Sequence, residues 1–263
     1  MHLLTRTVRL AVNTRDSSVG NNGFAGNPPL SGFGRWYEIE VTCRGHIDPK
    51  TGYLIDIKTV DSAVRDHAFP LLQNAVRVES SPERAVASMF EALASILPAS
   101  LQTLRLKPSP YYDLAMDAGD QTHVLVRQRF DFSAAHRLHS PALSDEENRR
   151  LYGKCNNPRG HGHNYVVQPV VKLRIDAAPS FSLHDLELIT DQHVIKPFDH
   201  KHLNEDTPEF RVDQGGVLPS VENIARICFE RLRPAIASHS ARPELVSVTV
   251  WETDRTSATY PAM

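Results

Sequence analysis

The chain has 263 residues, 23% of them charged, and a formal net charge of −2 with histidine neutral. This balance provides no basic surface of the kind that nucleic acid requires, so we expect no nucleic-acid partner. No apolar run is long enough to cross a bilayer, and residues 1–15 alternate like a strand rather than a signal peptide, so we expect no membrane partner. The three cysteines lack framework spacing, which favours a reducing cytoplasm.

The first half of the chain predicts two strands, two helices and two further strands. A Gly/Asn/Pro-rich loop separates the first two strands, and DPKTG is a turn signal after the second. Period-two and helical patterns place these elements, in order, at 3–12, 36–47, 60–72, 83–97, 101–106 and 111–116.

The second half predicts the same order of elements, at 123–136, 162–175, 184–195, 220–234, 244–253 and 257–260. Ser220 is the expected N-cap of the longer helix, and Pro234 its expected end. A repeat this long indicates two similar domains rather than a solenoid. We therefore predict an α+β protein with two tandem ββααββ domains, residues 1–118 and 119–263.

Three histidines in the second half form a candidate metal site. His161 and His163 are two residues apart at the start of a predicted strand, so both face one side of the sheet. His136 ends the preceding strand and faces the same point if the two strands pair as an antiparallel hairpin. Three imidazoles with one open position form a catalytic zinc arrangement, although the ligand type also suits iron or copper. For the paired histidines alone, a surface loop is the plainer interpretation.

Cys155 is a candidate reactive thiol. It lies in a polar loop, whereas Cys43 and Cys228 lie in apolar segments, as structural cysteines usually do. Lys154 and Arg159 nearby favour the thiolate, which can act as a nucleophile or a general base.

Four further residues are candidates for acid–base chemistry or binding. Asp199 and His200 are adjacent, and a histidine oriented by a carboxylate is a common acid–base device. From that segment alone, a histidine at a helix C-terminus is the plainer interpretation. Glu222 stands in a first helical turn, where it complements the helix dipole. Glu252, near a strand end, can accept two parallel hydrogen bonds from a ring with an N–C(–NH₂)–NH edge.

Together these motifs resemble one family. The segments FSAAHRL, SDEEN, GKCNNPRGHGHNY, FDHKHLNEDTPEF, SVEN and WETD follow one another with the family's spacing. From about residue 125 to the end, the chain is similar to the 6-pyruvoyl-tetrahydropterin synthases and to the 6-carboxytetrahydropterin synthases of queuosine and deazapurine biosynthesis. The resemblance implies the tunnelling fold, with antiparallel sheets that carry helices on one face and form rings around a channel.

The resemblance also implies a role for each candidate residue. His136, His161 and His163 match the Zn²⁺ ligands, Cys155 the catalytic thiol, Asp199 and His200 the pair that works with it, Glu252 the pterin anchor, and Glu222 a second acid near the pterin pocket.

The implied reaction converts 7,8-dihydroneopterin triphosphate, a small-molecule pterin substrate, to 6-pyruvoyl-tetrahydropterin with loss of triphosphate. This is a carbon–oxygen lyase reaction of tetrahydrobiopterin biosynthesis, in which zinc acts as a Lewis acid. One alternative is a 6-carboxytetrahydropterin synthase, which uses the same substrate and releases acetaldehyde. Another is a non-catalytic pterin-binding zinc protein, which the thiol disfavours. A zinc hydrolase of another class is disfavoured because the sequence has no HExxH motif.

The first half carries the scaffold without these residues. Alignment of GFGRWY (32–37) with GHGHNY (160–165) places Phe33 and Arg35 at the positions of the paired histidines. We therefore expect no zinc and no catalysis in residues 1–118. In the family, the thiol and the Asp–His pair of one site come from adjacent subunits. Complete sites then require second repeats of different chains, and we expect a homo-oligomer, a trimer of tandem chains.

Overall fold

The structure, a computed structural model, describes residues 1–14, 26–178 and 180–262. The chain divides into two compact units. The first consists of Met1–Arg127 with Lys172–Ala177, and the second of Gln128–Val171 with Ala178–Met263.

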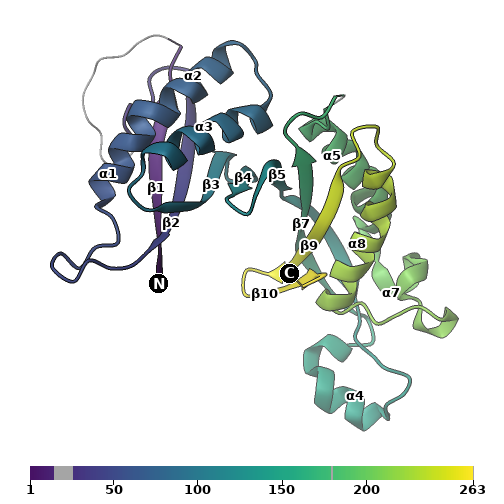
Figure 1. The fold of residues 1–263 in the computed structure, drawn as a ribbon. Coiled ribbons are helices and arrows are strands. Elements are labelled where there is room, and N and C mark those ends of the chain that lie inside the picture. The colour runs from purple at the N-terminus through teal and green to yellow at the C-terminus, as the bar shows by residue number, and fades with distance from the viewer. Residues whose placement is uncertain (15–25, 179, 263) are drawn as a thin grey trace. The chain divides into compact units, whose positions relative to one another are not determined.

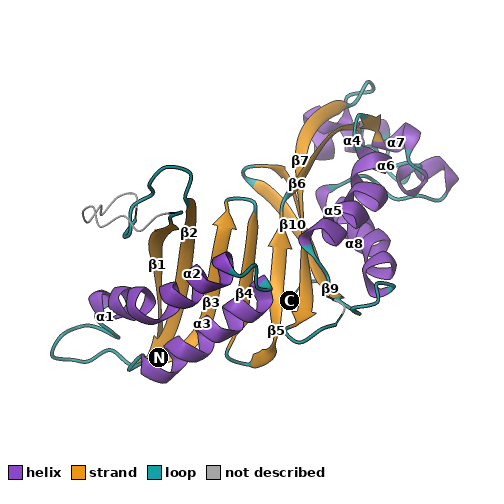
Figure 2. Ribbon diagram, turned by 90° about the horizontal axis from the view of Figure 1, so that it is seen from above, coloured by secondary structure: helices purple, strands orange, loops and turns teal. Residues whose placement is uncertain are grey.

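The first unit is a sheet with helices against one of its faces (Figures 1 and 2). Its elements are β1 (His2–Val12), β2 (Arg35–Gly45), α1 (Ile57–Ala63), the π-helical turn η1 (Val64–Ala68), α2 (Phe69–Arg77), α3 (Pro82–Ile96), β3 (Ser100–Ser109), β4 (Tyr112–Asp117) and β5 (Asp120–Gln128). The strands are ordered β1-β2-β3-β4-β5, and the pairs β1–β2, β2–β3 and β3–β4 are antiparallel.

Buried and more exposed side chains alternate along β2, and the buried ones mark the face of the sheet that the helices cover. On β2, Tyr37, Ile39, Val41 and Cys43 are buried, while the residues between them are more exposed. Side chains two apart share a face of the sheet, so these four point toward the helices and form the core with α1, α2 and α3.

The second unit has a sheet ordered β10-β9-β7-β6-β8. Its elements are β6 (Phe130–His136), α4 (Asp145–Tyr152), η2 (Gly153–Asn156), β7 (His161–Arg174), α5 (Leu183–Thr190), the π-helical turn η3 (Asp191–Ile195), α6 (Lys196–Phe198), β8 (Lys201–His202), α7 (Leu203–Asp206), η4 (Pro208–Phe210), η5 (Val212–Gln214), α8 (Val221–Ala237), β9 (Glu244–Thr253) and β10 (Thr256–Tyr260). β6 pairs with β7 antiparallel and with the short β8 parallel. That parallel pair is an exception to the antiparallel sheets we predicted.

The mixed α+β class is confirmed, and the element predictions need three corrections. The strand expected over 123–136 is two strands, β5 and β6, with a break at Arg129. The helix expected to end at Pro234 continues to Ala237, because a proline in the last turn removes only one hydrogen bond of the helix. The polar segment SDEEN begins α4, which the hydrophobic pattern did not indicate and which a Ser144–Glu147 capping box starts.

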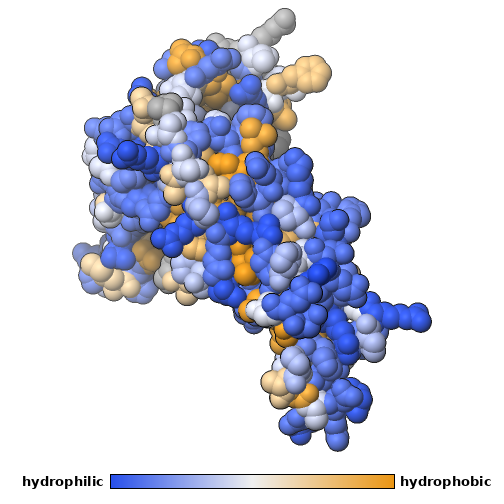
Figure 3. Space-filling model, turned by 90° about the vertical axis from the view of Figure 1, so that its right-hand side faces the viewer, coloured by the Kyte–Doolittle hydropathy of each residue, from blue (hydrophilic) through white to orange (hydrophobic). Residues whose placement is uncertain are grey.

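Polar residues dominate the molecular face drawn in Figure 3, with smaller hydrophobic patches between them. Among the residues described, no helix is both long and apolar enough to span a membrane.

Candidate metal centre and surrounding residues

The three predicted histidines meet on one face of the β6–β7 hairpin. His136 is paired directly with His161, and Ala134 is paired with His163. The antiparallel register and the two-residue period thus bring all three imidazoles together, as the sequence predicted. His136 is completely buried, and the other two are half-buried.

The ring nitrogens of this cluster have the arrangement that a cation requires. One nitrogen from each ring lies within 4.8 Å of the others. Nε2 of His136 is 3.1 Å from Nε2 of His161. Nε2 of His163 is buried without a hydrogen-bond partner among the described residues.

A backbone contact sets the tautomer of His136. Its Nδ1 is 2.7 Å from the carbonyl oxygen of Pro219, which can only accept, so Nδ1 carries the proton. The lone pair therefore remains on Nε2, on the side of the other two rings. This is the outer hydrogen bond that usually orients a metal-binding histidine. The residues present therefore fit a divalent metal ion held by three imidazoles.

Burial favours the neutral, metal-binding form of His136 and His161. Burial lowers the pKa of His136 to about 4. The hydrogen bond with Pro219 opposes this shift, and the charges of the neighbouring histidines add to it. Burial also lowers the pKa of His161, helped by the charge of His163.

Glu252 places its carboxylate beside the cluster. On β9, its Oε1 lies 3.3 Å from Nε2 of His136 and 3.6 Å from Nε2 of His163. The side chain is 20% exposed, so the carboxylate faces both the cluster and solvent. A ligand held by this carboxylate would therefore lie next to the metal position.

Cys155 lies in the loop that connects the two histidine-bearing strands. It belongs to the short turn η2, it is a free thiol, and it is partly exposed. Its carbonyl oxygen accepts a hydrogen bond from the backbone N–H of Leu138 at 2.9 Å, which ties this turn to the end of β6. The residue predicted to carry the reactive thiol is thus not enclosed in the core.

Asp199 and His200 form a hydrogen-bonded pair just before β8. Nδ1 of His200 is 2.7 Å from Oδ2 of Asp199, and the backbone N–H of Ser133 donates to Oδ1 of Asp199 at 2.9 Å. The contacts with Ser133 and then His200 lower the pKa of Asp199, so the carboxylate is ionised at neutral pH. His200 has φ of 55°, a left-handed conformation that is uncommon outside glycine.

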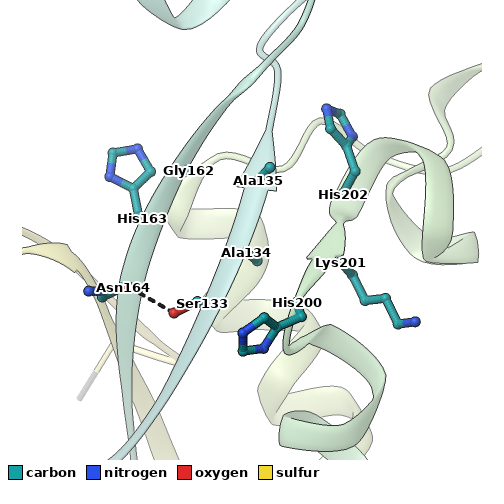
Figure 4. Close-up of a pocket in the computed structure, with 9 residues that line it drawn as sticks. All are labelled: Ser133, Ala134, Ala135, Gly162, His163, Asn164, His200, Lys201 and His202. Carbon is teal, nitrogen blue, oxygen red and sulfur yellow. Dashed lines mark hydrogen bonds between the residues drawn. The ribbon is translucent and has the colours of Figure 1, made fainter.

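The imidazole of His200 is 83% exposed and borders a groove of about 500 Å³ (Figure 4). The groove is lined by Ser133, Ala134, Ala135, Gly162, His163, Asn164, His200, Lys201 and His202. A hydrogen bond of 2.7 Å between Ser133 and Asn164 links the two strands at this groove. Because its imidazole is exposed, the Asp199–His200 pair can be reached by a substrate or by a residue of another chain.

Glu222 lies in the first turn of α8 and is exposed. The structure records no contact between its side chain and the histidine cluster. Dipole complementarity accounts for its position.

Sequence reasoning missed two residues of this region. Tyr165 is completely buried, lies on the face of β7 that carries His161 and His163, and has a hydroxyl without a partner among the described residues. Burial, with the nearby charges of Glu252 and Cys155, raises the pKa of Tyr165, so its hydroxyl remains protonated. His202 has a buried Nδ1 that is likewise unpartnered. Continuing the two-residue alternation from His163 would have identified Tyr165.

The fold and the cluster define a class: an α+β protein whose sheet carries a three-histidine cluster of metal-site geometry, with a partly exposed cysteine in the loop between the two histidine-bearing strands. Comparison with known proteins defines the family. The family model for 6-pyruvoyl tetrahydropterin synthase matches residues 125–262, just over half of the chain. The chain belongs to the 6-pyruvoyl tetrahydropterin synthase family, as the motifs predicted.

Individual relatives match about half of the chain. The 6-pyruvoyl tetrahydrobiopterin synthase of Homo sapiens is 40% identical over 144 residues, which are 54% of this chain and 94% of that protein. The Drosophila melanogaster protein of the same name is 36% identical over 143 residues, covering 53% of this chain and 80% of its own. The solved 6-pyruvoyl tetrahydropterin synthase of Caenorhabditis elegans is 35% identical, with a TM-score of 0.47, and the match covers 54% of this chain and 96% of that one.

Proposed function

We propose that this chain is a zinc-dependent pterin synthase that converts 7,8-dihydroneopterin triphosphate to 6-pyruvoyl-tetrahydropterin and releases triphosphate. The observation that carries the proposal is the histidine cluster, with ligand nitrogens within 4.8 Å of one another, inside the stretch that matches the family. The reaction needs no external oxidant, because oxidation of the substrate side chain is balanced by reduction of the pterin ring.

His136, His161 and His163 would hold the metal. Tetrahedral Zn²⁺ suits three neutral imidazoles with a fourth position left open, and the lowered pKa values of His136 and His161 keep both rings neutral. When bound, zinc supplies Lewis-acid polarisation of the substrate hydroxyls.

Cys155 would take and return protons at the substrate side chain. Its loop position leaves the thiol accessible, which a proton-transfer group requires. Glu252 would hold the pterin ring by its N–C(–NH₂)–NH edge, which places the ring beside the metal position. Glu222 is proposed as a second acid near the ring, on its position in the family motif alone.

Asp199 and His200 would carry protons and stabilise charge. Because Nδ1 of His200 donates to the Asp199 carboxylate, its Nε2 is free to accept a proton. The exposure of this imidazole supports a role in a site completed by a neighbouring chain. We propose a trimer of tandem chains on this basis.

Residues 1–118 would form a degenerate first repeat without catalysis, and residues 119–263 the catalytic repeat. The order of elements supports this division: β1 and β2 precede the main helical region of the first unit and β3 and β4 follow it, and β6 and β7 precede that of the second unit and β9 and β10 follow it. In both, a π-helical turn interrupts the first helical region, at Val64–Ala68 and at Asp191–Ile195. π-helical turns are rare, so their matching positions favour a common origin.

Product analysis tests the proposed reaction. The zinc-loaded protein and its Cys155→Ala variant are incubated with 7,8-dihydroneopterin triphosphate, and the products are identified by mass spectrometry. We expect triphosphate and a 6-pyruvoyl pterin from the wild type, and at least a hundredfold less from the variant.

The same experiment separates the two alternatives. Acetaldehyde with a 6-carboxy pterin would assign the chain to the 6-carboxytetrahydropterin synthases. No turnover by the wild type with zinc bound would indicate a non-catalytic pterin-binding protein.

A further inference from the structure

The first unit contains a cavity that the proposed reaction does not use. It has a volume of about 410 Å³, which is within the range of small-molecule sites. Leu72, Ala85 and Leu106, all buried, form an apolar part of its wall. These side chains come from α2, α3 and β3, so the cavity lies between the helices and the sheet of a single unit.

Three hydrogen-bond donors line this cavity without a side-chain partner among the described residues. Arg35 at the start of β2, Tyr37 on the same face of that strand, and Tyr112 on β4 all border it. The structure gives none of the three side chains a hydrogen bond or ion pair with any residue that it describes. Burial raises the pKa of Tyr112, with the charges of Glu83 and Asp113 adding to it, so this phenol is a protonated donor.

The donor set indicates the charge of a ligand. Arg35 is a permanent cation, and a guanidinium that lines the same cavity as two hydroxyls can bind a carboxylate in a bidentate contact with further hydrogen bonds. Tyr37 is only 6% exposed, so its ring belongs to the wall of the cavity, and its hydroxyl has no hydrogen-bond partner among the described residues. A bound anion would supply the acceptors that these donors lack.

The residues at the rim of the cavity indicate what the ligand carries besides its acidic group. Glu79 and Ser80, between α2 and α3, also line the cavity and offer an acceptor and a hydroxyl. Glu79 has φ of 51°, a left-handed conformation that is uncommon for glutamate. The apolar wall and the tyrosine rings suit a flat ring, and the carboxylate of Glu79 suits ring N–H groups.

We propose that this cavity binds a planar heteroaromatic carboxylate, with its acidic group on Arg35, Tyr37 and Tyr112 and its ring against the apolar wall. In the alignment of GFGRWY with GHGHNY, Arg35 and Tyr37 stand at the positions of His163 and Tyr165. The first unit thus has a fixed cation where the second has a metal-binding histidine. This ligand site lies outside the proposed catalytic centre and does not depend on turnover.

Calorimetric titration of the full chain with 6-carboxypterin tests the proposal. This probe combines a flat bicyclic ring with a carboxylate. We expect a site whose affinity falls at least about tenfold in Arg35→Leu and several-fold in Tyr112→Phe. Arg44→Leu, an exposed arginine at the other end of β2 and outside the cavity lining, is the matched control and should bind as the wild type does.

Two further titrations assign the site. 6-Hydroxymethylpterin, which lacks the acidic group, should bind at least about tenfold more weakly, while Glu252→Gln in the second unit should leave this site intact. The proposal is overturned if the wild type does not bind 6-carboxypterin at millimolar concentration. It is also overturned if Arg35→Leu and Tyr112→Phe both bind normally, or if Glu252→Gln removes all binding.

Discussion

At the scale of single residues, the candidate metal centre includes His136, whose burial makes the folded chain less stable at low pH. His136 is neutral in the folded chain, with a pKa of about 4, but has its ordinary value near 6.5 when unfolded. Its folded pKa is lowered, so between these values the unfolded chain binds more protons and acid favours unfolding.

We therefore expect the metal-free protein to lose stability as the pH falls from about 6.5 to about 4. The contribution of His136 is at most about 3 to 4 kcal/mol, from about 1.4 kcal/mol for each pKa unit. Urea unfolding of chelator-treated protein across this pH range measures it. In His136→Gln the fall should be smaller, and an equal fall in both proteins would contradict the assignment.

Gly160 is a second residue on which the site geometry depends. It has φ of 71°, and a Cβ at this position would lie 2.6 Å from Nε2 of His202 and 2.9 Å from the carbonyl oxygen of His136. Gly160→Ala should therefore lower the free energy of unfolding by more than about 1 kcal/mol and weaken metal binding, because the backbone of His136 must move.

Gly162→Ala is the matched control. A Cβ there would meet only the Ala134 carbonyl oxygen at 3.6 Å, an ordinary contact, so stability and metal binding should change little. Chemical unfolding and metal titration of both variants compare them. Equal losses in the two would show that Gly160 has no special role.

At the scale of elements, the N-terminus of α8 supports the metal centre. Ser220 caps this helix by accepting from the N–H of Asn223, and the residue before it, Pro219, accepts the hydrogen bond of His136. Ser220→Ala should lower the free energy of unfolding by about 1 kcal/mol. It should also lower the metal affinity, because the Pro219 carbonyl is no longer held in place.

Ser182→Ala provides the control for this helix-capping prediction. Ser182 caps α5 through a capping box with Asp185, away from the His136 contact. It should lose similar stability by urea unfolding and keep its metal affinity by calorimetry. If both variants bind the metal as tightly as the wild type does, the cap of α8 does not support the metal site, and the prediction is wrong.

The elements that the sequence predicted well are those with a strong hydrophobic period. The strands that carry the histidines alternate clearly, so their face and pairing could be predicted from His136, His161 and His163. α4 was missed because its helix signal is a capping box with a mostly polar sequence. The contact of His136 with Pro219 spans 83 residues, and no local pattern encodes it.

At the scale of the whole molecule, the proposed assembly makes one chain supply the thiol and another the acid–base pair. If so, Cys155→Ala and His200→Ala chains, each inactive alone, should regain part of the activity when they are mixed and refolded together. Triphosphate release measures this, with light scattering to check for three times the chain mass of 29.4 kDa. Mixtures that remain inactive would place both groups of a site on one chain.

The central claim is that each chain has one zinc-dependent catalytic centre, in its second unit. Titration of the metal-free full-length protein with zinc, while triphosphate release from 7,8-dihydroneopterin triphosphate is recorded, tests it most directly. We predict no release without metal and a linear rise that reaches a plateau at one zinc per chain. Release without metal, or a plateau at two zinc ions per chain, would contradict this account.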